Sequence, residues 1–316
     1  MKKVVVIGGG TGMSNLLSGL KQFPLDITAI VTVCDDGGST GILREEFNIP
    51  AVGDIRRVLV ALSETEPLVM DLFNYRFDPS KGLAEHTVGN LLLTASTDIT
   101  GNLSDGIEAL SKVLNLKGKV VPLTEDNVIL MAKMADGRII EGEHNITAAK
   151  DKIEKVYYKE KAIPNKKALK AIKQADLILL SMGSLYTSII PNLIIDEVVE
   201  EIEKSKAPIM YVCNMMTQPG ETDDFTVTDH VKILNEYLGK RKVDIVLANI
   251  GDIDSKLSEF YLVKEQKDPV RYDKENLDKY GLQAIEDDFI HITPNNLLRH
   301  DNIKLGFHIF YYLMRK

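Results

Sequence analysis

The sequence has little of what secreted and zinc-binding proteins depend on. Its 316 residues include no tryptophan and only two cysteines, Cys34 and Cys213. Each cysteine ends a run that reads as a buried strand, and two cysteines do not make a disulfide framework. Cysteine and histidine also do not occur at metal-binding spacings. We therefore expect a protein of a reducing compartment, the cytoplasm, without a Cys/His metal site.

Long apolar runs and an excess of positive charge are missing too. No apolar run reaches the roughly 18 residues that a membrane-spanning helix needs. The basic start and the run Val4–Ile7 resemble a signal peptide, but the run is too short and gives way to glycines. Lys+Arg number 38 against 46 for Asp+Glu, a net charge of −8. This balance does not favour nucleic acid or an anionic membrane as the main partner.

What is present is typical of a large α/β protein. The apolar fraction of 44% and the charged fraction of 27% are those of a globular chain. A predicted strand at Val4–Ile7 runs into the glycine loop Gly8–Gly12, and a helix with amphipathic spacing follows. Strand, glycine loop and helix form the phosphate-binding opening of a Rossmann-type unit, although Met13 replaces the third glycine of the dinucleotide fingerprint. The expected nucleotide contacts are Gly8, Gly9, Gly10, Thr11 and Gly12.

A second loop follows the predicted strand Ile27–Val33. It contains two acids and then a glycine-rich turn, namely Asp35, Asp36, Gly37, Gly38 and Ser39. An acid at the end of such a strand can hold a ribose, and two adjacent acids also suit a metal ion that carries phosphate oxygens. The glycines can present N–H groups to an anion. A plain strand-to-helix turn would use similar residues.

Two predicted helix starts carry further candidates. In the helix that starts near Gly53, Arg56 and Arg57 lie in the first turn, where the helix dipole disfavours cations. Either Asp54 or a bound phosphate would compensate, and we take Arg56 as a candidate phosphate ligand. Near the next helix start, His86 and Asn90 either bond to neighbouring backbone or face the ligand.

The rest of the chain predicts one doubly wound domain over residues 1–316. Residues 118–157 read as an antiparallel β-meander, an insertion or small subdomain, because short apolar segments there alternate with turns. Strands then end in Ser181, Asn214 and Asn249. Parallel connection would bring these ends and the first two loops to one edge of a mostly parallel sheet with helices on both faces. Tyr261 and Arg299, in the tail, either reach back over this edge or are ordinary surface residues.

Six motifs in this order resemble the gluconeogenesis-factor (YvcK-like) family, which is related to the 2-phospho-L-lactate transferases (CofD-like). The motifs are residues 6–12, 35–41, 53–56, 86–91, 183–188 and 211–218. The resemblance covers most of the chain and implies a Rossmann-like fold with a ligand cleft. It also implies polar ligand contacts at Asn90, Ser184, Thr187, Asn214 and Thr217, and metal or phosphate contacts at Asp35 and Asp36, with Mg²⁺ as the expected metal.

The resemblance leaves three functions open. The first is a cytoplasmic regulator of gluconeogenic growth, cell-wall synthesis and cell shape that binds a nucleotide sugar such as UDP-N-acetylglucosamine. It would act through a regulatory protein partner and assemble as a homo-oligomer. The second is a Mg²⁺-dependent transferase that acts on a donor activated by a nucleotide diphosphate. The third is an NAD(P)-binding oxidoreductase, which the broken glycine fingerprint disfavours.

Overall fold

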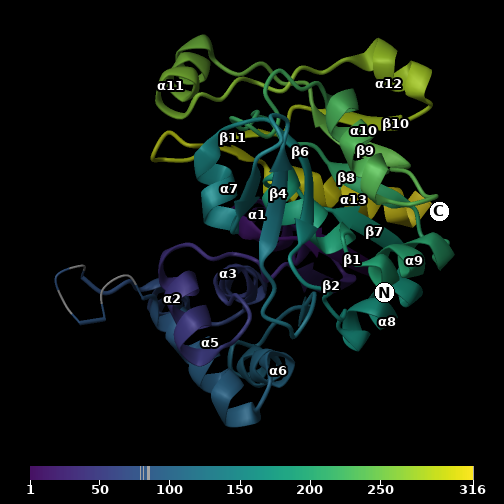
Figure 1. Cartoon of the computed structure of the whole chain (residues 1–316). Helices are drawn as coiled ribbons and strands as arrows, with labels where there is room; N and C mark the ends of the chain where they lie inside the picture. The colour runs from purple at the N-terminus through teal and green to yellow at the C-terminus, as the bar shows by residue number, and fades with distance from the viewer. Residues whose placement is uncertain (79, 81, 84–85, 316) are drawn as a thin grey trace.

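The centre of the computed structural model is a parallel sheet of seven strands in the order β10-β9-β8-β7-β1-β2-β3 (Figure 1). The structure describes residues 1–78, 80, 82–83 and 86–315. The strands are β1 (Lys2–Gly8), β2 (Leu25–Val31), β3 (Lys119–Pro122), β7 (Leu177–Leu180), β8 (Ile209–Val212), β9 (Ile245–Asn249) and β10 (Gln283–Asp287). The order reverses between β1 and β7, and ligands bind at such a switch point in open α/β sheets.

Helices cover both faces of this sheet. α1 (Gly10–Leu20) packs against α3 (Gly53–Leu62) and α13 (Asn302–Arg315). α8 (Lys166–Gln174) and α9 (Asp196–Lys204) pack together on the opposite face. Because both faces are covered, the central strands read as continuous apolar runs, and β7 and β8 are buried throughout. The predicted doubly wound α/β fold is confirmed.

The other helices extend the molecule at both ends of the sheet. Figure 1 shows α2, α3, α5 and α6 gathered at one end and α11 and α12 at the other. Their bounds are α2 (Gly38–Phe47), α4 (Pro67–Asn74), α5 (Val88–Thr100), α6 (Leu103–Val113), α10 (Val227–Tyr237), α11 (Ser255–Glu265) and α12 (Lys274–Tyr280). A π-helical turn, η1 (Leu185–Ile189), and a 3₁₀ turn, η2 (Ile190–Leu193), follow β7. No helix among the described residues is long and apolar enough to cross a membrane.

The antiparallel insertion begins later than the sequence suggested. Its sheet has the order β5-β4-β6, with β4 (Leu130–Met134), β5 (Ile139–Glu141) and β6 (Ile153–Tyr158), and it includes the helix α7 (Glu143–Ala149). The start of the predicted meander at residues 118–157 is wrong, because Lys119–Pro122 is β3 and pairs in parallel with β2. Two adjacent valines are equally compatible with either pairing. That residues 1–316 form a single domain stays a prediction.

Candidate functional site

A cavity of about 470 Å³ lies at the carboxyl ends of β1, β7 and β8. A small hairpin of β11 (Ile290–Ile292) and β12 (Leu298–His300), together with α11, forms its outer wall. Predicted site residues from both halves of the chain line this cavity. They are Gly10, Thr11, Gly12, Ser184, Asn214, Tyr261 and Arg299. The cavity therefore lies at the sheet edge where the sequence placed a ligand.

The amino end of α1 is open toward this cavity. Gly9 is the N-cap residue and has no side chain with which to cap the helix. Gly10 takes a φ of +69°, which glycine adopts without strain. At Gly12, a side chain would overlap the carbonyl oxygen of Met182, so glycine lets the first turn of α1 approach the loop after β7. The positive end of the helix dipole is thus presented to the cavity.

The loops after β7 and β8 are held together from below. The Ser184 hydroxyl donates to Glu221 Oε2 at 2.6 Å and accepts hydrogen bonds from the backbone N–H and the hydroxyl of Thr187. Asn214 clamps Gly183, accepting from its N–H at 3.0 Å and donating to its carbonyl at 2.7 Å. Burial raises the pKa of Glu221, while its hydrogen bonds to Ser184 and Tyr186 oppose the shift. Thr187 and Glu221 therefore position the loop beneath the cavity.

The outer wall is anchored by two hydrogen bonds to the body of the protein. Tyr261 Oη accepts from the Leu298 N–H at 2.9 Å, and His300 Nε2 lies 3.0 Å from the carbonyl oxygen of Cys213. Burial lowers the pKa of His300 to about 4, so this imidazole is neutral at pH 7 and its Nε2 donates. Between these anchors, Arg299 lines the cavity.

Arg299 brings an uncompensated positive charge to the cavity. Its Nη1 donates to the Leu298 carbonyl at 2.8 Å, and no carboxylate within the described part of the chain forms an ion pair with it. The other cation of the cavity, Lys267, is paired with Glu265 at 2.6 Å. A bound anion would therefore supply the partner that Arg299 lacks.

A second hollow, of about 420 Å³, adjoins the first, and Thr11, Asn15 and Arg299 line both. Its far wall carries Arg57, whose Nη1 lies 2.5 Å from the Oδ1 of the buried Asp54. Burial raises the pKa of Asp54, while Arg57 and the Gly10 N–H oppose the shift. Of the two compensating anions that the sequence left open for this helix start, Asp54 is the one in place, and Arg57 is its partner.

Arg56 points elsewhere. Its Nη1 donates to Asn74 Oδ1, its side chain packs against Gly89, and it lines neither hollow. Burial lowers the pKa of Arg56 to about 10, and its Nε has no partner among the residues that the structure describes. Adjacent helical residues point about 100° apart, and Arg56 and Arg57 accordingly have different partners. A ligand contact of Arg56 stays a prediction.

The loop after β2 forms a separate polar cluster. The Ser39 hydroxyl accepts from Asn90 Nδ2 and bonds to His86 Nδ1, both at 3.0 Å. Asn90 Oδ1 is buried and has no partner among the described residues. His86 and Asn90 thus meet a side chain rather than neighbouring backbone. This cluster stands at the start of α2, whose N-cap residue is Gly37 and whose first residue is Gly38.

The two acids of this loop have different surroundings. Asp36 accepts the N–H groups of Glu143 at 3.1 Å and His144 at 2.8 Å, which begin α7. Among the described residues, Asp35 accepts only the N–H of Gly37, at 3.0 Å. Burial, then the charge of Asp35, raises the pKa of Glu143 to about 7. In the chain as described, no group of three or more His, Cys, Asp or Glu is arranged to hold a metal.

These side chains alone do not make a resident Mg²⁺ site. Of the two predicted ligands, Asp36 is engaged by backbone N–H groups, and Asp35 retains one oxygen that accepts no hydrogen bond from the described residues. Any metal would need most of its oxygen ligands from a bound phosphate or from water. Metal binding by Asp35 and Asp36 stays a prediction.

Three further predicted residues lie beneath the site instead of lining it. Gly8 packs against Ser181, and Gly9 packs against Asp54. Thr217 is buried, and it pairs with Asp268 through its backbone N–H and its hydroxyl oxygen. Sequence reasoning missed Lys267 and Glu265, because α11 lacks the amphipathic spacing that marks a helix and the following loop contains no motif.

Comparison with known proteins places this geometry in a family. Residues 4–290 match the family described as 2-phospho-L-lactate transferase CofD. A protein of Bacillus subtilis called gluconeogenesis factor is 46% identical over 96% of both chains. A protein of Halalkalibacterium halodurans with the same name is 47% identical over 96% of this chain and 94% of its own length.

A solved structure agrees with the fold across the chain. A crystal structure of a Bacillus halodurans protein superposes with a TM-score of 0.94 at 46% identity, covering 98% of this chain and 99% of that one. These relatives match over nearly their whole length, so the match spans most of the chain that forms the cavity and the loop after β2. The chain belongs to the CofD family and is similar throughout to its members called gluconeogenesis factors.

Proposed function

We propose that this protein binds a nucleotide sugar of the UDP-N-acetylglucosamine type and acts as a regulator in gluconeogenic growth. One observation carries the proposal: the open amino end of α1 and the unpaired Arg299 face the same cavity. A diphosphate would bring negative charge to both groups. A helix N-terminus stabilises an anion, and an arginine can bind phosphate through two parallel hydrogen bonds.

The rest of the cavity suits the other parts of such a ligand. Its volume of about 470 Å³ lies within the range of small-molecule sites. Asn214 and Gln218 offer hydrogen-bonding groups for sugar hydroxyls, and Met215, Met216 and Leu297 offer apolar surface for a base. The lining as a whole is more polar than apolar, which suits a ligand made mainly of a sugar and phosphates.

The regulatory role rests on the relatives. Proteins that match this chain over nearly its whole length are called gluconeogenesis factors. The fraction of protein with ligand bound would follow the concentration of the nucleotide sugar. A regulatory protein partner would then distinguish the ligand-bound protein from the free protein. A role in cell-wall synthesis and cell shape, and assembly as a homo-oligomer, belong to the same proposal. Light scattering would measure the assembly.

Calorimetric titration with UDP-N-acetylglucosamine tests the proposal. Arg299→Ala removes a charge-assisted hydrogen bond and is expected to weaken binding by about 1.5–3 kcal/mol. Arg271→Ala is the matched control, because Arg271 is exposed, donates to the Asp224 carbonyl and lies outside the cavity lining. Binding that is equal in both variants and the wild type would contradict the proposed site. Parallel titrations with UDP, GDP and NAD identify the ligand class, and binding of NAD alone would favour an oxidoreductase.

Transferase activity is the second candidate, and the match to the CofD family favours it. Such an enzyme would use the same cavity for a donor activated by a nucleotide diphosphate. The test is to incubate the protein with Mg²⁺, a lactyl-phospho-nucleotide donor and a deazaflavin acceptor, and to follow nucleotide release. Release that requires both the acceptor and Arg299 would establish the transferase. Tight binding of the nucleotide sugar without release would leave the regulator as the supported function.

A further inference from the structure

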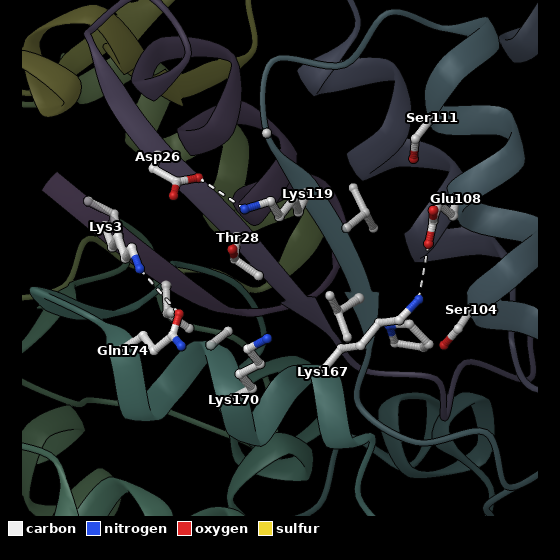
Figure 2. Close-up of a pocket in the computed structure, with 17 residues that line it drawn as sticks. Lys3, Asp26, Thr28, Ser104, Glu108, Ser111, Lys119, Lys167, Lys170 and Gln174 are labelled. Atoms are coloured by element: carbon white, nitrogen blue, oxygen red, sulfur yellow. Dashed lines mark hydrogen bonds and ion pairs between the residues drawn. The ribbon is translucent and has the colours of Figure 1, made fainter. Parts of the chain in front are cut away.

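Another hollow of the structure lies away from the cavity described above. It has a volume of about 510 Å³ and opens on one face of the sheet, between α6 and α8. Its floor comes from the amino-terminal parts of β1 and β2 and from β3. The cavity proposed to bind a nucleotide sugar, called the nucleotide cavity from here on, is at the carboxyl ends of β1, β7 and β8. Figure 2 shows Thr28 in the middle of this hollow, with lysines arranged around it.

The sheet itself explains why this face is open. In parallel register, Val5 pairs with Thr28 and Thr28 pairs with Lys119, so these three side chains share one face. The next row on this face contains Ile7 and Ile30, which are completely buried. Val5 is buried, whereas Thr28 is half-buried and Lys119 is exposed, so helical cover is incomplete over β2 and β3. Such gaps are unusual, because both faces of a parallel sheet are normally covered.

Positive charge predominates around the hollow. Four lysines line it, from β1, β3 and α8, against two carboxylates. These residues are Lys3, Lys119, Lys167, Lys170, Asp26 and Glu108. The excess of two positive charges stands out on a protein whose net charge is −8. Lys119 pairs with Asp26 at 3.4 Å and Lys167 pairs with Glu108 at 3.1 Å.

Lys170 has no such partner. It forms no ion pair with any residue that the structure describes, and Figure 2 shows it pointing from α8 toward Thr28. The Thr28 hydroxyl likewise has no hydrogen-bond partner among those residues. Around these two groups the floor is apolar, made by Val5, Val121 and Ala171. Lys3 also forms no ion pair with the described residues, and its Nζ donates to Gln174 Oε1 at 3.2 Å. An apolar floor with ammonium groups that lack a carboxylate, and a hydroxyl above it, matches an organic anion with a flat apolar body.

We propose that this hollow is a second ligand site, independent of the nucleotide cavity, for a small amphiphilic anion. The apolar body would lie on Val5 and Val121, and the acid group would accept hydrogen bonds from Lys170 and Thr28. A carboxylate, a sulfonate or a phosphate monoester would provide the same chemistry. Burying apolar surface supplies the affinity, and the lysines select for negative charge.

The test uses the full-length protein and 2-naphthoate as the probe, followed by NMR of valine methyl groups. Binding is expected to shift the methyl signals of Val5 and Val121. 2-Naphthalenemethanol has the same rings without charge, and acetate has the charge without rings. Both are expected to bind at least about tenfold more weakly, which corresponds to 1.4 kcal/mol. Equal binding of the alcohol would overturn the assignment of an anion.

Variants distinguish binding in this hollow from binding elsewhere on the protein. Lys170→Gln is expected to weaken 2-naphthoate binding about five- to tenfold, roughly the value of one charge-assisted hydrogen bond. Lys173→Gln, on the same helix but outside the hollow, is the matched control and should leave binding unchanged. Thr28→Phe fills the floor with a residue that strands accommodate and should abolish binding, with the thermal unfolding midpoint as the check on folding.

The nucleotide cavity provides the last comparison. Saturating UDP-N-acetylglucosamine and the Arg299→Ala variant should both leave 2-naphthoate binding unchanged, because Arg299 does not line this hollow. Displacement of 2-naphthoate by the nucleotide sugar would show that the probe occupies the nucleotide cavity, and this would overturn the proposal. No binding at millimolar concentration, or equal binding to the Lys170→Gln and Lys173→Gln proteins, would overturn it too.

Discussion

Asp35 and Asp36 are identical in chemistry and adjacent in sequence, yet their surroundings differ. Asp36 accepts two backbone N–H groups at the start of α7, as an N-terminal capping residue does, although it comes from a loop more than 100 residues away. Asp35 accepts one N–H within its own loop. Adjacent residues in an extended segment point to opposite sides, so a pair of acids seldom shares one role.

This difference predicts that Asp36 stabilises the fold more than it binds metal. Asp36→Ala would leave two N–H groups of α7 without an acceptor and should cost about 1–2 kcal/mol of unfolding free energy. Urea denaturation measures this loss. Asp36→Asn keeps one oxygen acceptor and should lose less. An unchanged urea midpoint in Asp36→Ala, together with loss of Mg²⁺-dependent nucleotide binding, would instead identify Asp36 as a metal ligand.

At the scale of single elements, the sequence predicts buried structure well and edges poorly. The strands β1, β2, β7, β8 and β9 and the helices α3, α5 and α10 follow from apolar runs and helical spacing, because the core requires both. The sequence does not reveal β10, because it is a half-buried edge strand with only two apolar residues, Ala284 and Ile285, before two acids. α2 was hidden within a glycine-rich segment that also reads as a turn.

Some residues of the candidate site could likewise be predicted from the sequence, and others could not. The glycine loop of β1 and the polar ends of β7 and β8 could be predicted, because parallel strands bring their carboxyl ends together. Which of Arg56 and Arg57 pairs with Asp54 could not, since it depends on the rotation of α3 about its axis. The contributions of Lys267 and Glu265 depend on how the segment after α11 folds back, which no local pattern encodes.

The hydrogen bond between His300 of β12 and the Cys213 carbonyl predicts that the stability of the fold depends on pH. His300 fastens β12 to the carbonyl of Cys213, and burial lowers its pKa from 6.5 to about 4. The folded state therefore favours the neutral imidazole. Its stability contribution is complete above about pH 6.5 and is lost as the pH falls toward 4, by up to about 3 kcal/mol.

Urea denaturation of the wild type and His300→Gln between pH 7 and 4 measures this contribution. The glutamine amide can still donate to the carbonyl but does not titrate in this range, so the variant should lose less stability than the wild type on acidification. His291→Gln is the control, because His291 is exposed on β11. Parallel stability curves for the wild type and His300→Gln would show that the pKa of His300 is the same in the folded and unfolded states, and would contradict the lowered pKa.

At the scale of the whole molecule, the two ends of the chain close the site. Asn15 Nδ2, on α1, donates to the His300 carbonyl at 2.9 Å, although 285 residues separate them. Asn302 Nδ2 donates to Ser18 Oγ at 2.7 Å and fixes the start of α13 on the same helix. The amino-terminal glycine loop and Arg299 therefore form one site only in the complete fold.

Hydrogen exchange should reveal this assembly when UDP-N-acetylglucosamine binds. A ligand that bridges both ends of the chain is expected to slow amide exchange in four distant segments together: the first turn of α1, residues 183–188, residues 214–218 and β12. α6 and α8, around the other hollow, should exchange at unchanged rates.

Saturation at about 100 times Kd stabilises the fold by about 2.7 kcal/mol, enough to slow global opening about a hundredfold. The comparison therefore uses short exchange times, at which local opening dominates. Arg299→Ala, which is expected to weaken binding by about 1.5–3 kcal/mol, should reduce the protection in all four segments together at a ligand concentration near the wild-type Kd. Protection confined to the α1 loop would mean that the ligand contacts only the glycine loop, and the cavity as described would not be the binding site.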